Sequence, residues 1–159
     1  MLRKLLFVIL VFFSFGSYSQ RDSYVSLEAL GSGGLGGIFY ERDFATMGIA
    51  DFQYRLGFSF VPIDVNNGTV LIFPHMVHAL LGQGMSRLDI GLGFTASITT
   101  RGQFFVRNPL SIGYRFEPPK KNFYLRASYT PIISMIIDDQ WQHWGGLTIG
   151  FKLTNRNVE

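Results

Sequence analysis

The sequence of 159 residues contains no cysteine, and this absence removes several kinds of chemistry at once. There is no disulfide, no thiol nucleophile, no cysteine-ligated zinc and no lipid-modified N-terminal cysteine. Charge is also scarce: 16% of the residues are Asp, Glu, Lys or Arg, whereas 47% are hydrophobic and 16% are aromatic. So large an apolar share with so little charge favours a protein that exposes apolar surface to a nonpolar environment.

Basic blocks are absent as well, since no five consecutive residues are Lys or Arg. A nucleic-acid partner or a polybasic membrane contact therefore has no electrostatic footprint, and no nucleic acid is expected. Residues 1–20 (MLRKLLFVILVFFSFGSYSQ) combine Arg3 and Lys4 with a short apolar run and small residues before Gln20. This pattern predicts a secretory signal peptide, followed by one domain over residues 21–159. Without the leader, twelve basic residues face eleven acidic ones.

No segment after the leader reaches 18 uninterrupted apolar residues, so no transmembrane helix is predicted. Alternation with period two recurs instead, which is the pattern of half-buried strands. It is clean over residues 52–60, 87–96, 110–117, 123–130 and 146–153. It is weaker over 24–30, 35–42 and 70–81, and the last of these is apolar on both faces. Within 70–81, Pro74 predicts a bulge or another irregularity. The total is eight strands.

The connections between these strands differ in length. Short turns are expected at about residues 43–50, 82–86 and 118–122, and longer loops at 62–69, 98–108 and 131–143. Short turns on one rim and long loops on the other are typical of transmembrane barrels. The sequence thus predicts an all-β fold, an eight-stranded antiparallel up-and-down transmembrane β-barrel whose longer loops face outward.

The residues on the polar face of the strands indicate which face of the barrel wall meets lipid and which lines the lumen. That face carries glycines such as Gly57, Gly91 and Gly150, which suit the crowded inner wall of a narrow barrel better than a solvated surface. Aromatics near the strand ends, Tyr24 and Trp144 among them, are expected in interfacial girdles. A soluble secreted barrel with the apolar face inward, around a ligand cavity, remains an alternative.

The stretch GSGGLG, residues 31–36, matches the glycine spacing of a dinucleotide-binding fingerprint. That fingerprint needs a helix after it, and the following GGIFYERDF has no apolar stripe of helical period. A glycine-rich turn at the outer rim, joining the first two strands, is therefore expected, and no cofactor is predicted.

Charged residues on the polar face would lie inside the barrel. An isolated charge there costs several kcal/mol, so such charges are expected to pair. The predicted lumen network comprises Glu28, Glu41, Arg55, Asp89, Arg115 and Arg126. A conducting path through these charges, forming a narrow pore, is the alternative.

Other reactive side chains give weaker signals. His75 and His78 are three residues apart, which places them on opposite faces of a strand, so no metal site is predicted. Asp138, Asp139 and His143 fall in the expected loop 131–143 and are interpreted as solvated residues. The strand serines, Ser59, Ser111 and Ser128, fall on the inner face, away from a lipid substrate. We therefore expect no enzyme, although a lipid-modifying enzyme stays an alternative.

A signal peptide, eight alternating strands and a last strand WGGLTIGFKL resemble the small outer-membrane β-barrel proteins of Gram-negative bacteria. The closing-strand signal of that class falls on Trp144, Gly146, Ile149 and Phe151. The resemblance implies a location in the cell outer membrane, contact with outer-membrane lipid and lipopolysaccharide, and insertion by the barrel-assembly machinery. It implies a structural or surface-interaction role through the outer loops, whose ligand it does not name.

Overall fold

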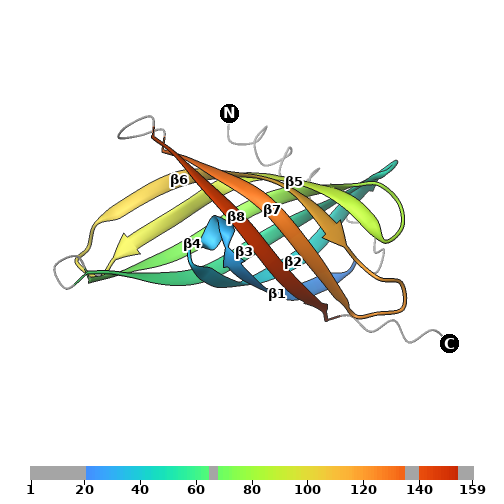
Figure 1. The fold of residues 1–159 in the computed structure, drawn as a ribbon, viewed down its shortest axis with the longest axis horizontal. Helices are drawn as coiled ribbons and strands as arrows, with labels where there is room; N and C mark the ends of the chain where they lie inside the picture. Colours follow the sequence, from blue (N-terminus) through green and yellow to red (C-terminus); the bar gives the residue numbers. More distant parts are fainter. Residues whose placement is uncertain (1–20, 65–67, 135–139, 154–159) are drawn as a thin grey trace, which may run out of the picture.

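The computed structural model describes residues 21–64, 68–134 and 140–153, so the predicted signal peptide (1–20) lies outside the described residues. Eight strands form a closed barrel in which each strand pairs antiparallel with the next and β8 pairs with β1 (Figure 1). This confirms the predicted eight-stranded up-and-down barrel. Among the described residues, no helix is long and apolar enough to cross a membrane. In chain order the elements are β1 (Ser23–Leu30), η1 (Gly31–Gly33), β2 (Gly36–Met47), β3 (Ala50–Asp64), β4 (Gly68–Leu81), β5 (Ser86–Thr99), β6 (Phe104–Phe116), β7 (Phe123–Ser134) and β8 (Gln140–Lys152).

The strands are longer, and the connections shorter, than the sequence pattern predicts. β5 runs to Thr99 and β6 begins at Phe104, so the expected loop 98–108 is mostly strand. Pairs such as Ser97 with Phe105 continue the ladder, and the Thr99 amide donates to the Gln103 carbonyl at 2.9 Å to close the turn. Backbone groups make a ladder, so a strand can continue after its side-chain alternation weakens. The prediction of long outer loops is wrong for this connection, and most of 62–69 and 131–143 is strand as well.

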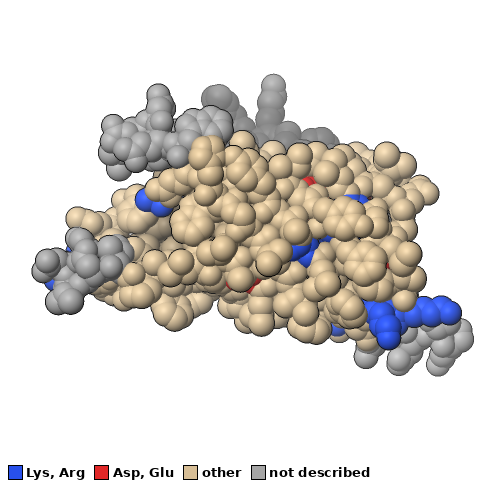
Figure 2. Space-filling model, in the orientation of Figure 1, with Lys and Arg blue, Asp and Glu red and all other residues tan. Residues whose placement is uncertain are grey.

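The two faces of the wall follow the predicted alternation. On β5, Leu92 is 63% exposed on the outside, whereas Asp89 is fully buried inside. The same separation holds along β3, β6, β7 and β8. In the view of Figure 2 the wall is mostly uncharged, and the larger charged areas lie toward the two ends. An apolar band of this kind is the surface that a transmembrane barrel presents to lipid.

Strand β4 has an irregularity at Pro74, as predicted, but it is an interruption of pairing and not a bulge. Pairing with β5 runs without a shift from Val70 to Leu81, and the register with β3 is the same before and after the proline. The β3 pairs skip Gly57 and Phe58, opposite the proline, so the ring interrupts pairing locally and leaves the register unchanged. The register shifts lie elsewhere, between Asp43 and Ala45 of β2 and between Pro62 and Asp64 of β3.

Glycines on the inner face make room for large side chains on the neighbouring strand. A Cβ atom at Gly91 would stand 2.5 Å from the imidazole of His78, its direct cross-strand partner. Gly57 and Gly150 have the same relation to aromatic rings. Each large side chain thus fills the space that a glycine leaves, and the inner wall is closely packed at these three positions. The three cross-strand pairs are Phe39 with Gly57, His78 with Gly91, and Tyr124 with Gly150.

The wall is uneven at the end opposite the termini. β1 pairs with β8 only as far as Gly146, and β2 pairs with β3 only as far as Ser59. β8 continues outward to Gln140 along β7, and β3 continues to Asp64 along β4. The β1–β2 hairpin is therefore shorter than the strands on either side of it. Taking the termini as periplasmic, this is the outer end of the barrel.

Candidate functional site

A cluster of buried charges occupies the lumen. The structure brings together all six residues that the sequence assigns to the network, from six different strands, and each is at most 4% exposed. Three are carboxylates and three are guanidinium groups, so their formal charges cancel. They are Glu28 on β1, Glu41 on β2, Arg55 on β3, Asp89 on β5, Arg115 on β6 and Arg126 on β7.

Glu28 is the centre of this cluster. Its Oε2 atom accepts from Arg55 Nη1 at 2.9 Å and from Arg126 Nη2 at 3.0 Å. The same two arginines then reach the other carboxylates: Arg55 Nε donates to Glu41 Oε1 at 2.9 Å, and Arg126 Nη1 donates to Asp89 Oδ2 at 3.2 Å. Each guanidinium therefore joins two carboxylates, which satisfies the pairing that burial demands.

Arg115 extends the cluster across the full width of the barrel. Its Nη1 atom lies 3.6 Å from Glu41 Oε2, although β6 and β2 are on opposite sides of the ring. The guanidinium also lies over the rings of Tyr124 and Tyr24, at 3.6 and 4.8 Å from their centroids. The Tyr124 hydroxyl in turn donates to Glu41 at 2.7 Å. Aromatic faces attract the cation and hold it in the lumen.

Toward the periplasmic end the network reaches the rim. Arg115 Nη2 lies 3.3 Å from Glu117 Oε2, and Glu117 also pairs with Arg87, which binds Asp51 at 3.0 Å. Burial opposes ionisation of Glu117, but Arg115, the Tyr24 hydroxyl and Arg87 together hold its pKa below the usual value. The carboxylate is therefore a charged member of the network.

His78 is a lumen residue that the sequence analysis missed. Its Nδ1 atom lies 2.5 Å from Asp89 Oδ1, and both side chains are fully buried. Since strand 70–81 is apolar on both faces, alternation gave no signal for its orientation. His75 points outward and stacks on Phe94, with ring centroids 4.9 Å apart, as expected for opposite faces of one strand.

The GSGGLG segment folds into the barrel instead of staying at the rim. The residues of η1 are buried, and both the amide and the hydroxyl of Ser32 donate to Glu28 Oε1 at 3.0 Å. Gly31 has φ of +86°, and a Cβ there would stand 2.8 Å from the Glu28 carboxylate. Only glycine fits this close approach. The segment caps the charged cluster from the outer side, and in Figure 1 it lies within the barrel.

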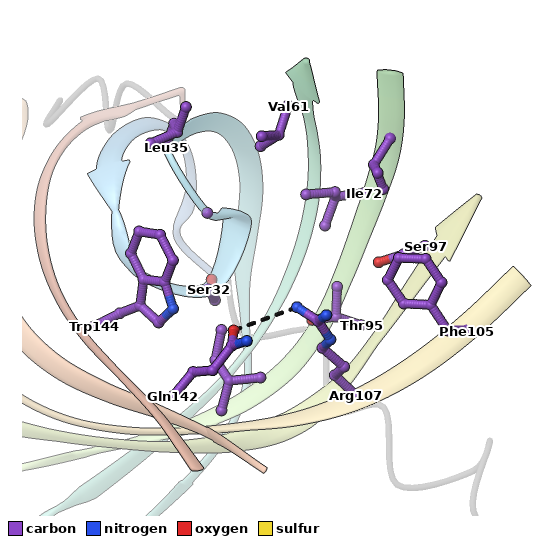
Figure 3. Close-up of a pocket in the computed structure, with 13 residues that line it drawn as sticks. Ser32, Leu35, Val61, Ile72, Thr95, Ser97, Phe105, Arg107, Gln142 and Trp144 are labelled. Atoms are coloured by element: carbon purple, nitrogen blue, oxygen red, sulfur yellow. Dashed lines mark hydrogen bonds between the residues drawn. The ribbon is translucent and has the colours of Figure 1, made fainter. Parts of the chain in front are cut away.

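Beyond this cap the lumen changes from charged to apolar. A cavity of about 280 Å³ opens there, with Trp144, Phe105 and Arg107 around it (Figure 3). Trp144 faces inward and Tyr24 is buried in the lumen, so the prediction that both belong to interfacial girdles is wrong. Trp144 shares the parity of Gly146 and Gly150 on the inner face of β8, and this alternation, extended by one pair of residues, would have placed it inside. The full lining is Ser32, Gly34, Leu35, Val61, Val70, Ile72, Thr95, Ser97, Phe105, Arg107, Ile132, Gln142 and Trp144.

The remaining candidates do not form a site. Within the described residues there is no group of three or more potential metal ligands. Asp138 and Asp139 lie outside the described residues. His143 is exposed and bonds the Tyr129 hydroxyl. The serines that a lipid-modifying enzyme would need on the outside are inside: Ser59 is 2% and Ser111 is 6% exposed.

Comparison with known proteins identifies the fold. No family model and no curated protein sequence matches the chain. The N-terminal β-barrel domain of Pseudomonas aeruginosa OprF aligns with a TM-score of 0.56 and 13% identity, covering 83% of this chain and 96% of that one. The Yersinia pestis outer membrane protein Ail in a phospholipid nanodisc aligns with a TM-score of 0.56 and 12% identity, covering 84% and 99%. The fold is that of the small outer-membrane barrels. At these identities the likeness concerns the fold alone, and the activity has to be inferred from the barrel's own lumen and surface.

Proposed function

We propose that this barrel is an integral outer-membrane protein with a closed, non-conducting lumen, and that it has a structural or surface-interaction role. The single observation that carries the closed lumen is the ionic network, which runs from Asp89 through Arg126, Glu28, Arg55 and Glu41 to Arg115. Its members come from six strands, and the contact between Arg115 and Glu41 bridges opposite walls.

An ion crossing this lumen would have to displace side chains that bind one another. Removing one partner of a buried pair costs roughly 3–5 kcal/mol. Barrels of eight strands are also just wide enough for side chains to fill. Both arguments favour a closed lumen over the narrow pore.

The outer wall supports the membrane assignment. Its exposed Leu, Ile and Phe side chains, such as Leu147 at 67% and Phe60 at 61% exposure, would contact outer-membrane lipid and lipopolysaccharide. Insertion would use the barrel-assembly machinery, which serves proteins of this architecture. We propose no enzymatic activity, because the strand serines face the lumen, away from lipid.

Two measurements test this function. The expressed protein is fractionated, and its gel mobility is compared with and without boiling; recovery in the outer membrane with a heat-modifiable band is expected. The purified barrel is then added to planar phospholipid bilayers, where no stepwise conductance is expected. A soluble protein would contradict the membrane assignment, and stepwise conductance from heat-modifiable protein would contradict the closed lumen.

A further inference from the structure

The outer cavity differs in character from the rest of the lumen. Its walls are built from inward-facing cross-strand pairs, among them Val61 with Val70 and Ser97 with Phe105. Trp144, Ile132 and Ile72 complete an apolar surface. We propose that this cavity binds an alkyl chain that ends in an anionic group. The proposal goes beyond the closed outer-membrane barrel, because a closed lumen needs no ligand.

One end of the cavity is equipped for an anion. Arg107 is its only charged lining residue among those described, and no carboxylate lines it. The Arg107 Nη1 atom donates to Gln142 Oε1 at 3.4 Å. The guanidinium carbon of Arg107 lies 5.1 Å from the centroid of the Phe105 ring. In Figure 3 the guanidinium points into the cavity toward Gln142. A guanidinium in this setting suits a carboxylate or a phosphate.

A second, independent observation points to a ligand. Thr95 lines the cavity and is 5% exposed, and its buried hydroxyl has no hydrogen-bond partner among the described residues. Thr95 is the direct cross-strand neighbour of Arg107. A buried hydroxyl without a partner costs free energy. A head group bound by Arg107 would supply an acceptor for this hydroxyl once the Thr95 side chain turns toward the cavity.

The short β1–β2 hairpin provides a route from the membrane. Residues 140–145 of β8 and 60–64 of β3 lie beyond the last pairs with β1 and β2, so the wall between them is not closed by a described strand. The cavity lining includes Gln142 and Trp144 on one side of this interruption and Val61 on the other. Leu35, 56% exposed, lies at its base. An amphiphile in the outer leaflet could therefore enter sideways, chain first.

The volume limits the occupant to one chain. Ligand cavities typically measure roughly 300–1,000 Å³, and this cavity, at about 280 Å³, lies just below that range. A free fatty acid or one acyl chain of an anionic lipid meets this limit, and the two share the same chemistry. A lipid with several chains could place only one of them inside.

Tryptophan fluorescence provides the test, because the chain has only Trp141 and Trp144. A Trp141→Phe barrel in phosphatidylcholine nanodiscs keeps Trp144 as the reporter inside the cavity. The probe is 11-bromoundecanoate, whose bromine quenches nearby indole; a second arm uses nanodiscs that contain phosphatidylglycerol with brominated chains. Saturable quenching is expected in at least one arm. If quenching saturates with the free acid and not with the lipid, the ligand is a fatty acid. If it saturates with the lipid and not with the free acid, the ligand is one acyl chain of an anionic lipid.

Three variants in this background separate the cavity from the bilayer. Arg107→Gln should raise the half-saturating concentration at least fivefold, whereas Arg42→Gln, an exposed arginine on β2, should leave it unchanged. Ser97→Phe fills the cavity and should abolish the saturable component; heat-modifiable mobility checks that each variant is folded. Quenching that is linear, or unaffected by Ser97→Phe, would mean partition into the bilayer only and would overturn the proposal. Saturable quenching that Arg107→Gln leaves unchanged would overturn the anionic head group. Neither result would alter the fractionation or conductance results.

Discussion

Replacing Glu28 with glutamine tests whether the lumen network stabilises the barrel. The Glu28 side chain is 1% exposed and accepts from Arg55, Arg126 and Ser32 at 2.9–3.0 Å. Glutamine keeps the shape and one acceptor oxygen but removes the charge, so three buried guanidinium groups would face two buried carboxylates. Breaking a buried pair costs roughly 3–5 kcal/mol. Because Arg55 keeps Glu41 and Arg126 keeps Asp89, we expect the low end of that range, about 3 kcal/mol.

The measurement is the free energy of unfolding of the barrel in phosphatidylcholine bilayers, from guanidinium titrations followed by heat-modifiable mobility and tryptophan fluorescence. The control is Asp22→Asn, which breaks an ion pair with Lys152 at the periplasmic rim, where the side chains are 25% and 22% exposed. Pairs with this degree of exposure contribute about 0–1 kcal/mol. Equal, small losses in the two variants would refute the reasoning, because burial would then not distinguish the lumen network from a rim pair.

Three further substitutions test the wall, the cap and the packing. Leu92→Arg places a charge at mid-strand on the outer face and should reduce membrane insertion by about 2–4 kcal/mol; normal insertion in a refolding assay would contradict the lipid-facing assignment. Gly31→Ala should reduce unfolding free energy more than Gly48→Ala, since both have positive φ but only Gly31 is crowded. Gly150→Leu intrudes on the Tyr124 ring, so overpacking of about 1–3 kcal/mol is expected from denaturant titration; an unchanged midpoint would argue against that packing.

Local alternation was enough to predict much of this protein. Period-two patterns at 52–60 and 87–96 predicted which residues face out, and the same parity placed Arg55 and Asp89 inside. Charges on the inner face have to pair once buried, so alternation and solvation together were enough to predict six members of the network, although not His78. The inner-face glycines were predicted as well, because a narrow barrel crowds its lumen.

The tertiary structure decided what alternation cannot encode. Register between strands brings His78 to Asp89 and sets Gly91 beside the imidazole, yet strand 70–81 is apolar on both faces and gave no local signal. Backbone ladders extend β5 and β6 past the point where side-chain alternation weakens, so loop lengths were overestimated. These features depend on which strand is the neighbour, and a period read along one strand carries no information about its neighbours.

The outer cavity shows the same division. Arg107, Gln142 and Trp144 are distant from Val61 along the chain, and nothing in their local sequence marks a common cavity. The cavity exists because the β1–β2 hairpin is short and η1 folds inward onto Glu28, which leaves the longer strands to enclose space beyond it. The sequence determined the strands, their two faces and the charges that must pair; closure of the ring and the unequal strand lengths determined what the lumen contains. The physical reason is that side-chain alternation is set within one strand, whereas an enclosed volume is set by all of them together.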